Sequence, residues 1–298
     1  MATLFMFAAI GELLDQRSGV LNVGLEGLML FGAASGFITT TLTGSLLLGF
    51  LVGMAVGGAV GLLHGFLSIS LRVNQVVSGM AIWILAFGLT TYLANPFTGP
   101  LPRGVSSWRI GGLLSPLFFV AVALVFIIWF ILSKTHLGLK IRAVGEDPSV
   151  AEASGINVTR TRYLCVIIGG VLGGLSGAFL SLTYLGTWSH NPVAGRGWIS
   201  LALVFFSMWR PGLLFAGALI FGTLWQFALA PEMLLPGLAL PLQFYRMIPF
   251  AVTIVILIVV STERFRKRWG LAKPAALGLP YVKAVSYTHL RAHETVLD

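Results

Sequence analysis

The chain alternates between long apolar segments and short polar ones. A helix needs about 20 mostly apolar residues to cross the hydrocarbon core of a bilayer. Two apolar segments, 1–14 and 199–209, are too short to cross it as ordinary helices. The pattern predicts an all-α polytopic transmembrane helical bundle with about seven to nine membrane segments. The segments that qualify as spans are 25–42, 46–71, 76–94, 114–132, 163–185, 212–230 and 247–261.

Composition supports a lipid environment. Charged residues make up only 10% of the chain, against roughly 25% in soluble domains, so an ordinary soluble protein is excluded. The net charge of +9 comes from bases spread between apolar segments rather than clustered with aromatic residues, which argues against nucleic acid as a partner. Most of the 19 Lys and Arg residues fall on the side that holds 134–162. By the positive-inside rule, we expect that side to face the cytoplasm.

Two glycine-rich segments resemble each other. Residues 56–65 read VGGAVGLLHG and residues 168–177 read IGGVLGGLSG, and an FLS sequence follows closely after each. In the expected topology these segments run in opposite directions, as in the inverted repeats of many transporters. Chance similarity between glycine-rich membrane helices is the alternative. In either case, glycines at every fourth position predict a helix face on which a neighbouring backbone approaches closely.

The longest cytoplasmic loop, 134–162, contains signals for a short helix. Asp147 provides an N-cap, Pro148 suits the first helical position and Gly155 provides a C-terminal stop. These residues predict a helix of about two turns over 148–154. Because so short a helix is unstable alone, we expect it to dock on another surface. The alternative is a well-capped loop with no partner.

Three long motifs carry a family resemblance: RSGVLNVGLEGLMLFGA at 17–33, RAVGEDPSVAEASGI at 142–156 and GRGWISLALVFFSMWRP at 195–211. Together they resemble the membrane permeases of bacterial ABC importers in the branched-chain amino acid and simple sugar permease family. The NVGLEG sequence at 22–27 and KPAALGLPY at 273–281 are most similar to the nucleoside and simple-sugar branch. The resemblance implies a multi-pass protein of the bacterial inner (plasma) membrane that imports a solute.

The resemblance also implies partners. In the family the short cytoplasmic helix is a coupling helix that fits a groove of a separate ATPase subunit. This chain has no GxxxxGK sequence for a phosphate-binding loop, so we expect ATP and magnesium to bind in that ATPase and the chain to be a transport subunit rather than an enzyme. A second permease subunit and an extracytoplasmic substrate-binding lipoprotein are further implied partners, beside membrane lipid. The ATPase-coupling positions carried over are Arg142, Gly145, Glu146, Asp147, Pro148, Ala151 and Gly155.

Polar residues at membrane depth are the leads for a substrate pathway, because an unsatisfied polar group in hydrocarbon costs several kcal/mol. The absence of an evident buried charge pair favours an uncharged solute, a nucleoside or simple sugar, over branched-chain amino acids. A branched-chain amino acid ABC permease and a proton- or sodium-coupled secondary transporter remain alternatives. A metal site is not expected, since His136 and His190 fall on opposite sides of the membrane. The pathway candidates are Asn22, Glu26, Asn74, Gln75, Ser78, Asn191 and Gln226.

The C-terminal end differs in character from the rest of the chain. Residues 285–295 read VSYTHLRAHET, which includes His289 and His293 but has no apolar periodicity. This stretch resembles the translation of a sequencing-library adapter. We therefore assign 1–284 to the transmembrane permease domain and interpret 285–298 as a non-native tail, in which the two histidines form no metal site.

Overall fold

The computed structural model describes residues 1–102, 115–229, 241–262 and 273–282. The predicted tail at 285–298, and the ends of two predicted spans at residues 114 and 230, lie outside these ranges. Among the described residues the regular structure is helical apart from one short antiparallel pair, β1 (Gly99–Pro100) with β2 (Thr187–Trp188), in which Gly99 lies opposite Trp188. The α-helices are α1 (Ala2–Arg17), α2 (Leu25–Thr43), α3 (Leu46–Gly65), α4 (Gln75–Ala94), α5 (Pro116–Lys134), α6 (His136–Glu146), α7 (Pro148–Ala153), α8 (Val158–Phe179), α9 (Arg196–Phe206), α10 (Pro211–Leu229) and α11 (Leu242–Ser261).

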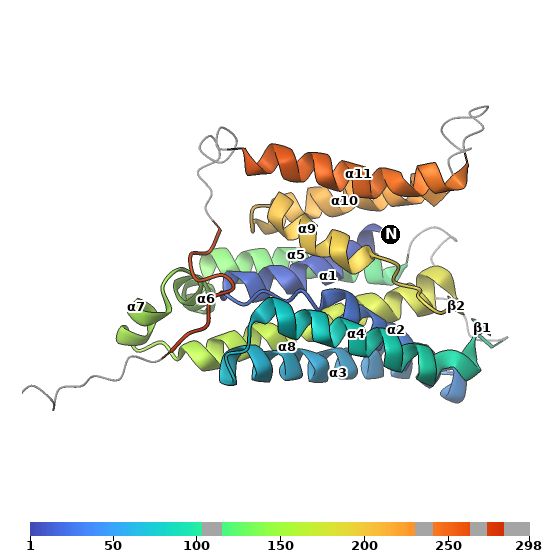
Figure 1. Ribbon diagram of the computed structural model, residues 1–298, viewed down its shortest axis with the longest axis horizontal. Helices are drawn as coiled ribbons and strands as arrows, with labels where there is room; N and C mark the ends of the chain where they lie inside the picture. Colours follow the sequence, from blue (N-terminus) through green and yellow to red (C-terminus); the bar gives the residue numbers. More distant parts are fainter. Residues whose placement is uncertain (103–114, 230–240, 263–272, 283–298) are drawn as a thin grey trace, which may run out of the picture.

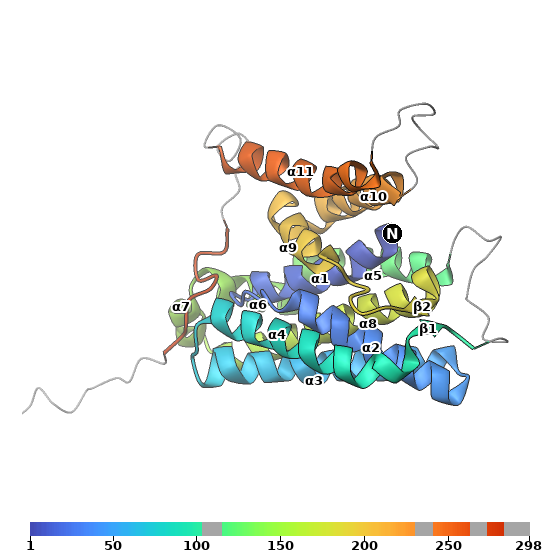
Figure 2. The same ribbon diagram turned by 45° about the vertical axis from the view of Figure 1, so that its right-hand side comes forward.

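The long helices lie side by side, with α6 and α7 at one end of the bundle and the β1–β2 pair at the other (Figures 1 and 2). Six described helices are long and apolar enough to cross a membrane, and two shorter apolar helices overlap α9 and α11. These helices confirm the all-α polytopic prediction. By the positive-inside argument, the end with α6 and α7 faces the cytoplasm.

The short segment at the start of the chain forms the centre of the bundle. Helix α1 has only 16 residues, yet its side chains from Thr3 to Gln16 are all buried. It packs against α8, α9, α10 and α5. A segment too short to count as a span is therefore central to the structure, because its neighbours rather than its length determine its burial.

The glycine-rich segments pack against each other, as their spacing predicts. Helices α3 and α8 cross antiparallel, and a Cβ atom added at Gly57 or Gly174 would overlap backbone atoms of the facing helix. At Gly61 an added Cβ would lie 2.7 Å from the carbonyl oxygen of Val166. Each helix continues directly into a π-helix, η1 (Phe66–Ser70) after α3 and η3 (Leu180–Leu185) after α8. The opposite directions and the shared π-helical ends support the interpretation as an inverted repeat.

Helix α9 is the predicted short membrane helix. Its 11 residues begin after Gly195, whose backbone has a φ of +86°, and end at Phe206. Two non-glycine residues with positive φ, Met208 and Trp209, then redirect the chain into α10, which starts at Pro211. Helix α9 thus returns the chain to the cytoplasmic end without a full-length span, and α10 leaves from this turn.

Candidate functional site

The cytoplasmic end carries a pair of short helices, α6 and α7, which meet at Asp147. Asp147 caps α7, its carboxylate accepting hydrogen bonds from the backbone N–H groups of Ser149 at 2.9 Å and Val150 at 3.1 Å. The bond from the Ser149 hydroxyl and the backbone bond from Val150 hold the pKa of Asp147 below its usual value. Helix α7 spans Pro148–Ala153, and Gly155 follows with a φ of +82°. The prediction of a capped two-turn helix is confirmed.

The two faces of α7 differ. Ala151 is buried against Val144 and Val158, whereas the side chain of Val150 is 60% exposed. Gly145 is buried in α6, and a Cβ atom there would overlap the carbonyl group of Arg17. Gly145 and Ala151 thus pack the helix pair against the bundle. Val150 is more accessible to a partner protein than these two buried residues. The ATPase contacts themselves stay a prediction. Of the predicted positions, Pro148 is partly exposed, and those that are exposed are Arg142, Glu146, Asp147 and Gly155.

A C-terminal segment, residues 273–282, secures this helix pair, and it lies beside α6 and α7 in Figure 1. The Ala276 N–H donates to the carbonyl oxygen of Gly145 at 2.9 Å, and the Gly278 N–H donates to that of Gly19 at 3.2 Å. The Tyr281 hydroxyl donates to the Glu152 carboxylate. Desolvation and this carboxylate raise the pKa of Tyr281 to about 12, so the hydroxyl remains a donor at physiological pH. This role could not be derived from the sequence of the segment alone.

Buried polar side chains support the non-helical connection between α1 and α2. Glu12 is 1% exposed, and its Oε1 atom accepts from the Gln16 side chain at 2.8 Å and from the Asn22 N–H at 3.2 Å. The Asn22 side-chain oxygen accepts from the Gly24 N–H at 3.1 Å. These bonds replace the backbone bonds that a continuous helix would make at this depth.

The start of α4 packs against the same connection. Gln75 accepts through Oε1 from the Leu21 N–H at 2.7 Å, and Ser78 pairs with the Nδ1 atom of buried His64 at 3.1 Å. Asn74 caps α4 by accepting from the N–H groups at 76 and 77. The structure thus brings Asn22, Gln75 and Ser78 together, with Asn74 at the edge, and gives each a structural hydrogen bond. Their part in a substrate pathway stays a prediction.

Glu26 links α2 to the start of α9. Its Oε1 atom accepts from the Gly195 N–H at 2.7 Å and its Oε2 atom accepts from the Gly197 N–H at 2.6 Å. Glu26 is 2% exposed. A carboxylate placed at a helix N-terminus satisfies free N–H groups and interacts favourably with the helix dipole. Glu26 therefore fixes the position of the short helix within the membrane.

A cavity of about 320 Å³ lies next to this short helix, between α9, α10 and α11. The Arg196 guanidinium lies over the Trp225 ring at 4.5 Å, and the Trp225 and Phe250 rings meet edge to face at 5.8 Å. The buried Nε atom of Arg196 and the Nε1 atom of Trp225 have no acceptor among the described residues. Because both atoms are buried, a solute in the cavity can accept from them only when the surrounding side chains move.

One predicted pathway residue, Asn191, lines this cavity. Its side-chain oxygen also accepts from the Ala194 N–H at 3.1 Å. Gln226 lies outside the lining and accepts from the Tyr184 hydroxyl at 2.7 Å. The sequence-based list omitted Arg196, Trp225, Arg246 and Phe250, which all line the cavity. An arginine within an apolar segment was the available signal for Arg196.

Comparison with known proteins shows that the chain is similar to permease subunits of transporters. The family described as "Branched-chain amino acid transport system / permease component" matches residues 1–257. A glucose ABC transporter permease candidate of Haloferax volcanii is 40% identical, with 93% of each chain covered. The guanosine ABC transporter permease protein NupQ of Bacillus subtilis is 35% identical, with 95% of this chain and 94% of its own covered.

The nucleoside ABC transporter permease protein NupC of Lactococcus lactis is 31% identical, also with 95% of this chain and 94% of its own covered. A second nucleoside ABC transporter permease of that organism, NupB, is 32% identical over 40% of this chain. No solved structure matches the chain.

Proposed function

Because the chain belongs to the family of permease components of branched-chain amino acid transport systems, we propose that it translocates nucleosides into the cytoplasm, with simple sugars as the second solute class. As a member of this family, it is a membrane-spanning transport subunit of an ABC importer in the plasma membrane. The observation that carries this proposal is similarity over nearly the whole chain to permeases named for guanosine and nucleosides. Family membership favours ATP-driven transport over the ion-coupled alternative.

The cavity beside α9 supports a solute without a positively charged group. Its lining includes aromatic rings at Trp225 and Phe250 and polar groups at Asn191 and Arg196, and no acidic residue of the described chain lines it. A nucleobase can stack on an aromatic ring, and carbonyl or hydroxyl oxygens can accept from the unpaired donors. A branched-chain amino acid would bring an ammonium group, for which the cavity offers no carboxylate.

The helix pair α6–α7 supports coupling to a separate ATPase subunit, which binds ATP and magnesium and receives the exposed face of α7. A capped helix held at both ends by hydrogen bonds can transmit a rigid-body movement. A second permease subunit completes the pathway, an inference supported by the two related nucleoside permeases of one organism. An extracytoplasmic substrate-binding lipoprotein delivers the solute at the end that carries β1 and β2.

Uptake measurements test the solute. In vesicles that contain the complete transporter, we expect ATP-dependent accumulation of radiolabelled guanosine that excess unlabelled nucleoside suppresses and excess leucine does not. Trp225→Phe keeps an aromatic ring but removes the Nε1 donor, so KM for guanosine should rise about five-fold, the effect of one lost hydrogen bond.

The matched control is Phe119→Ala on α5, where the side chain is 57% exposed and does not line the cavity. Its KM should equal that of the parent protein. Suppression of guanosine uptake by leucine, or an unchanged KM in Trp225→Phe, would contradict the proposal.

A further inference from the structure

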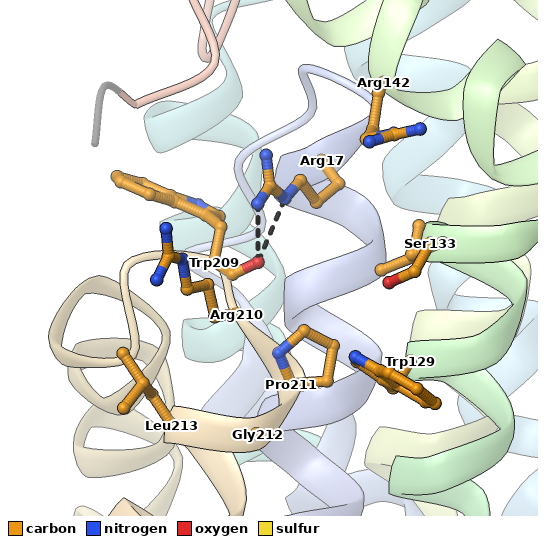
Figure 3. Close-up of a pocket in the computed structure, with 10 residues that line it drawn as sticks. Arg17, Trp129, Ser133, Arg142, Trp209, Arg210, Pro211, Gly212 and Leu213 are labelled. Carbon is orange, nitrogen blue, oxygen red and sulfur yellow. Dashed lines mark hydrogen bonds between the residues drawn. The ribbon is translucent and has the colours of Figure 1, made fainter. Parts of the chain in front are cut away.

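A second cavity, of about 410 Å³, opens at the cytoplasmic end of the bundle. It lies between the ends of α1 and α5, the side of α6 and the connection from α9 to α10 (Figure 3). Three arginines are among its lining residues, Arg17, Arg142 and Arg210, and no acidic residue of the described chain is. Apart from Arg142, which is also a predicted ATPase contact, the residues that line this cavity have no part in the transport function proposed above.

The positive charge in this cavity is only partly offset by a nearby carboxylate, that of Glu146. Arg17 donates through Nε and Nη2 to the carbonyl oxygen of Trp209 at 3.0 and 2.8 Å, which fixes its position but brings no negative charge. Arg142 and Arg210 are close enough to repel Arg17 electrostatically, and Glu146 is close enough to attract it. Glu146 does not line the cavity, and its carboxylate accepts from the Ala275 N–H at 3.4 Å. The cavity therefore favours an anion.

One wall of the cavity belongs to the lipid-facing surface. Trp129, which is 45% exposed, lies near the cytoplasmic end of α5, a usual depth for tryptophan at the membrane interface. Helix α10 begins at Pro211 on the opposite wall. Further into the membrane the same two helices meet through the Phe126 and Phe215 rings, 6.3 Å apart. Phe126 is 58% exposed, so apolar chains can lie along this surface.

We propose that this cavity binds the phosphate of an anionic phospholipid of the cytoplasmic leaflet, with its acyl chains against α5 and α10. Arg142 and Arg210 lie on opposite sides of Arg17 (Figure 3) and attract the phosphate electrostatically, and Trp129 lies at the glycerol level. An acidic side chain of the ATPase subunit is the competing occupant. The lipid is favoured because two membrane-spanning helices contribute to the cavity walls, whereas no residue of α7 lines the cavity.

Lipid binding to the purified protein tests this proposal, with native mass spectrometry as the readout. The unmodified protein should retain phosphatidylglycerol in preference to phosphatidylcholine. Arg210→Gln should weaken phosphatidylglycerol binding about five-fold, as expected for one basic group at an anionic membrane surface. Arg160→Gln is the matched control, since Arg160 is an exposed cytoplasmic residue at the start of α8 that does not line the cavity; it should bind as the parent does.

Several results would overturn the proposal. Equal retention of the two lipids, or equal binding by the two variants, would show that the cavity does not select an anionic lipid. Displacement of phosphatidylglycerol by millimolar inorganic phosphate would identify a free-anion site instead. Unchanged lipid binding with loss of ATPase co-purification in Arg210→Gln would assign the cavity to the ATPase. None of the lipid measurements depends on transport, so their outcome is separate from that of the solute proposal.

Discussion

Replacing Gly174 with valine will destabilise the helical bundle by about 3 kcal/mol or more, the upper range for overpacking a closely packed interior. Gly174 lies where α8 crosses both α2 and α3, and an added Cβ atom would overlap the carbonyl oxygen of Gly53. Gly32 approaches Gly174 from the α2 side. Because the obstructing atoms are backbone, side-chain rotation cannot relieve the clash. Thermal unfolding in detergent should show Tm lowered by roughly 10 °C.

Gly88→Val provides the matched control for this change. Gly88 lies in α4, and a Cβ atom there would meet no atom within 4 Å. The same increase in side-chain volume should therefore leave Tm nearly unchanged. Equal Tm values for the two variants would show that the close packing of α3 and α8 does not determine stability.

Replacing Glu26 with alanine will have the second large effect, a loss of nucleoside uptake of at least about ten-fold. The change leaves the N–H groups of Gly195 and Gly197 without their acceptors. Hydrogen bonds to a charged acceptor contribute about 1.5–3 kcal/mol each, and no water replaces them at this depth. Helix α9 should then lose its fixed position, which uptake assays and hydrogen exchange at its first turn would both detect.

Glu26→Gln tests whether the shape and hydrogen bonding of the Glu26 side chain, or its negative charge, hold α9 in position. The amide keeps the shape of the side chain and one carbonyl acceptor, so it should retain more uptake and more protection from exchange than Glu26→Ala. Fast exchange in Glu26→Ala with normal uptake would show that the position of α9 is irrelevant to transport. Normal exchange and normal uptake would show that the carboxylate does not hold the helix.

Features encoded in local sequence could be predicted. Asp147, Pro148 and Gly155 lie within nine residues of one another and define α7 through capping chemistry alone. The four-residue glycine spacing in α3 and α8 predicted close approach because helix geometry places such residues on one face. The shortness of 199–209 likewise anticipated α9.

Features that depend on long-range packing could not be predicted. Glu26 and Gly195 are separated by 169 residues, so the sequence indicated a polar residue at depth but not what it holds. Helix α1 is too short to be predicted as a span, whereas its burial comes from the helices packed around it. The cavity beside α9 combines Arg196 with Trp225 and Phe250 from two other helices, a juxtaposition that only the folded chain creates.

We propose that this subunit receives ATP-driven movement through α7. A photo-crosslinking amino acid at Val150, expressed together with the partner ATPase, tests it most directly. Ile84 on α4 is the matched control position, because it is 61% exposed against 60% for Val150 but lies within a membrane span. We expect a covalent adduct with the ATPase from position 150 and none from position 84. No adduct from position 150, or equal adducts from both, would contradict it.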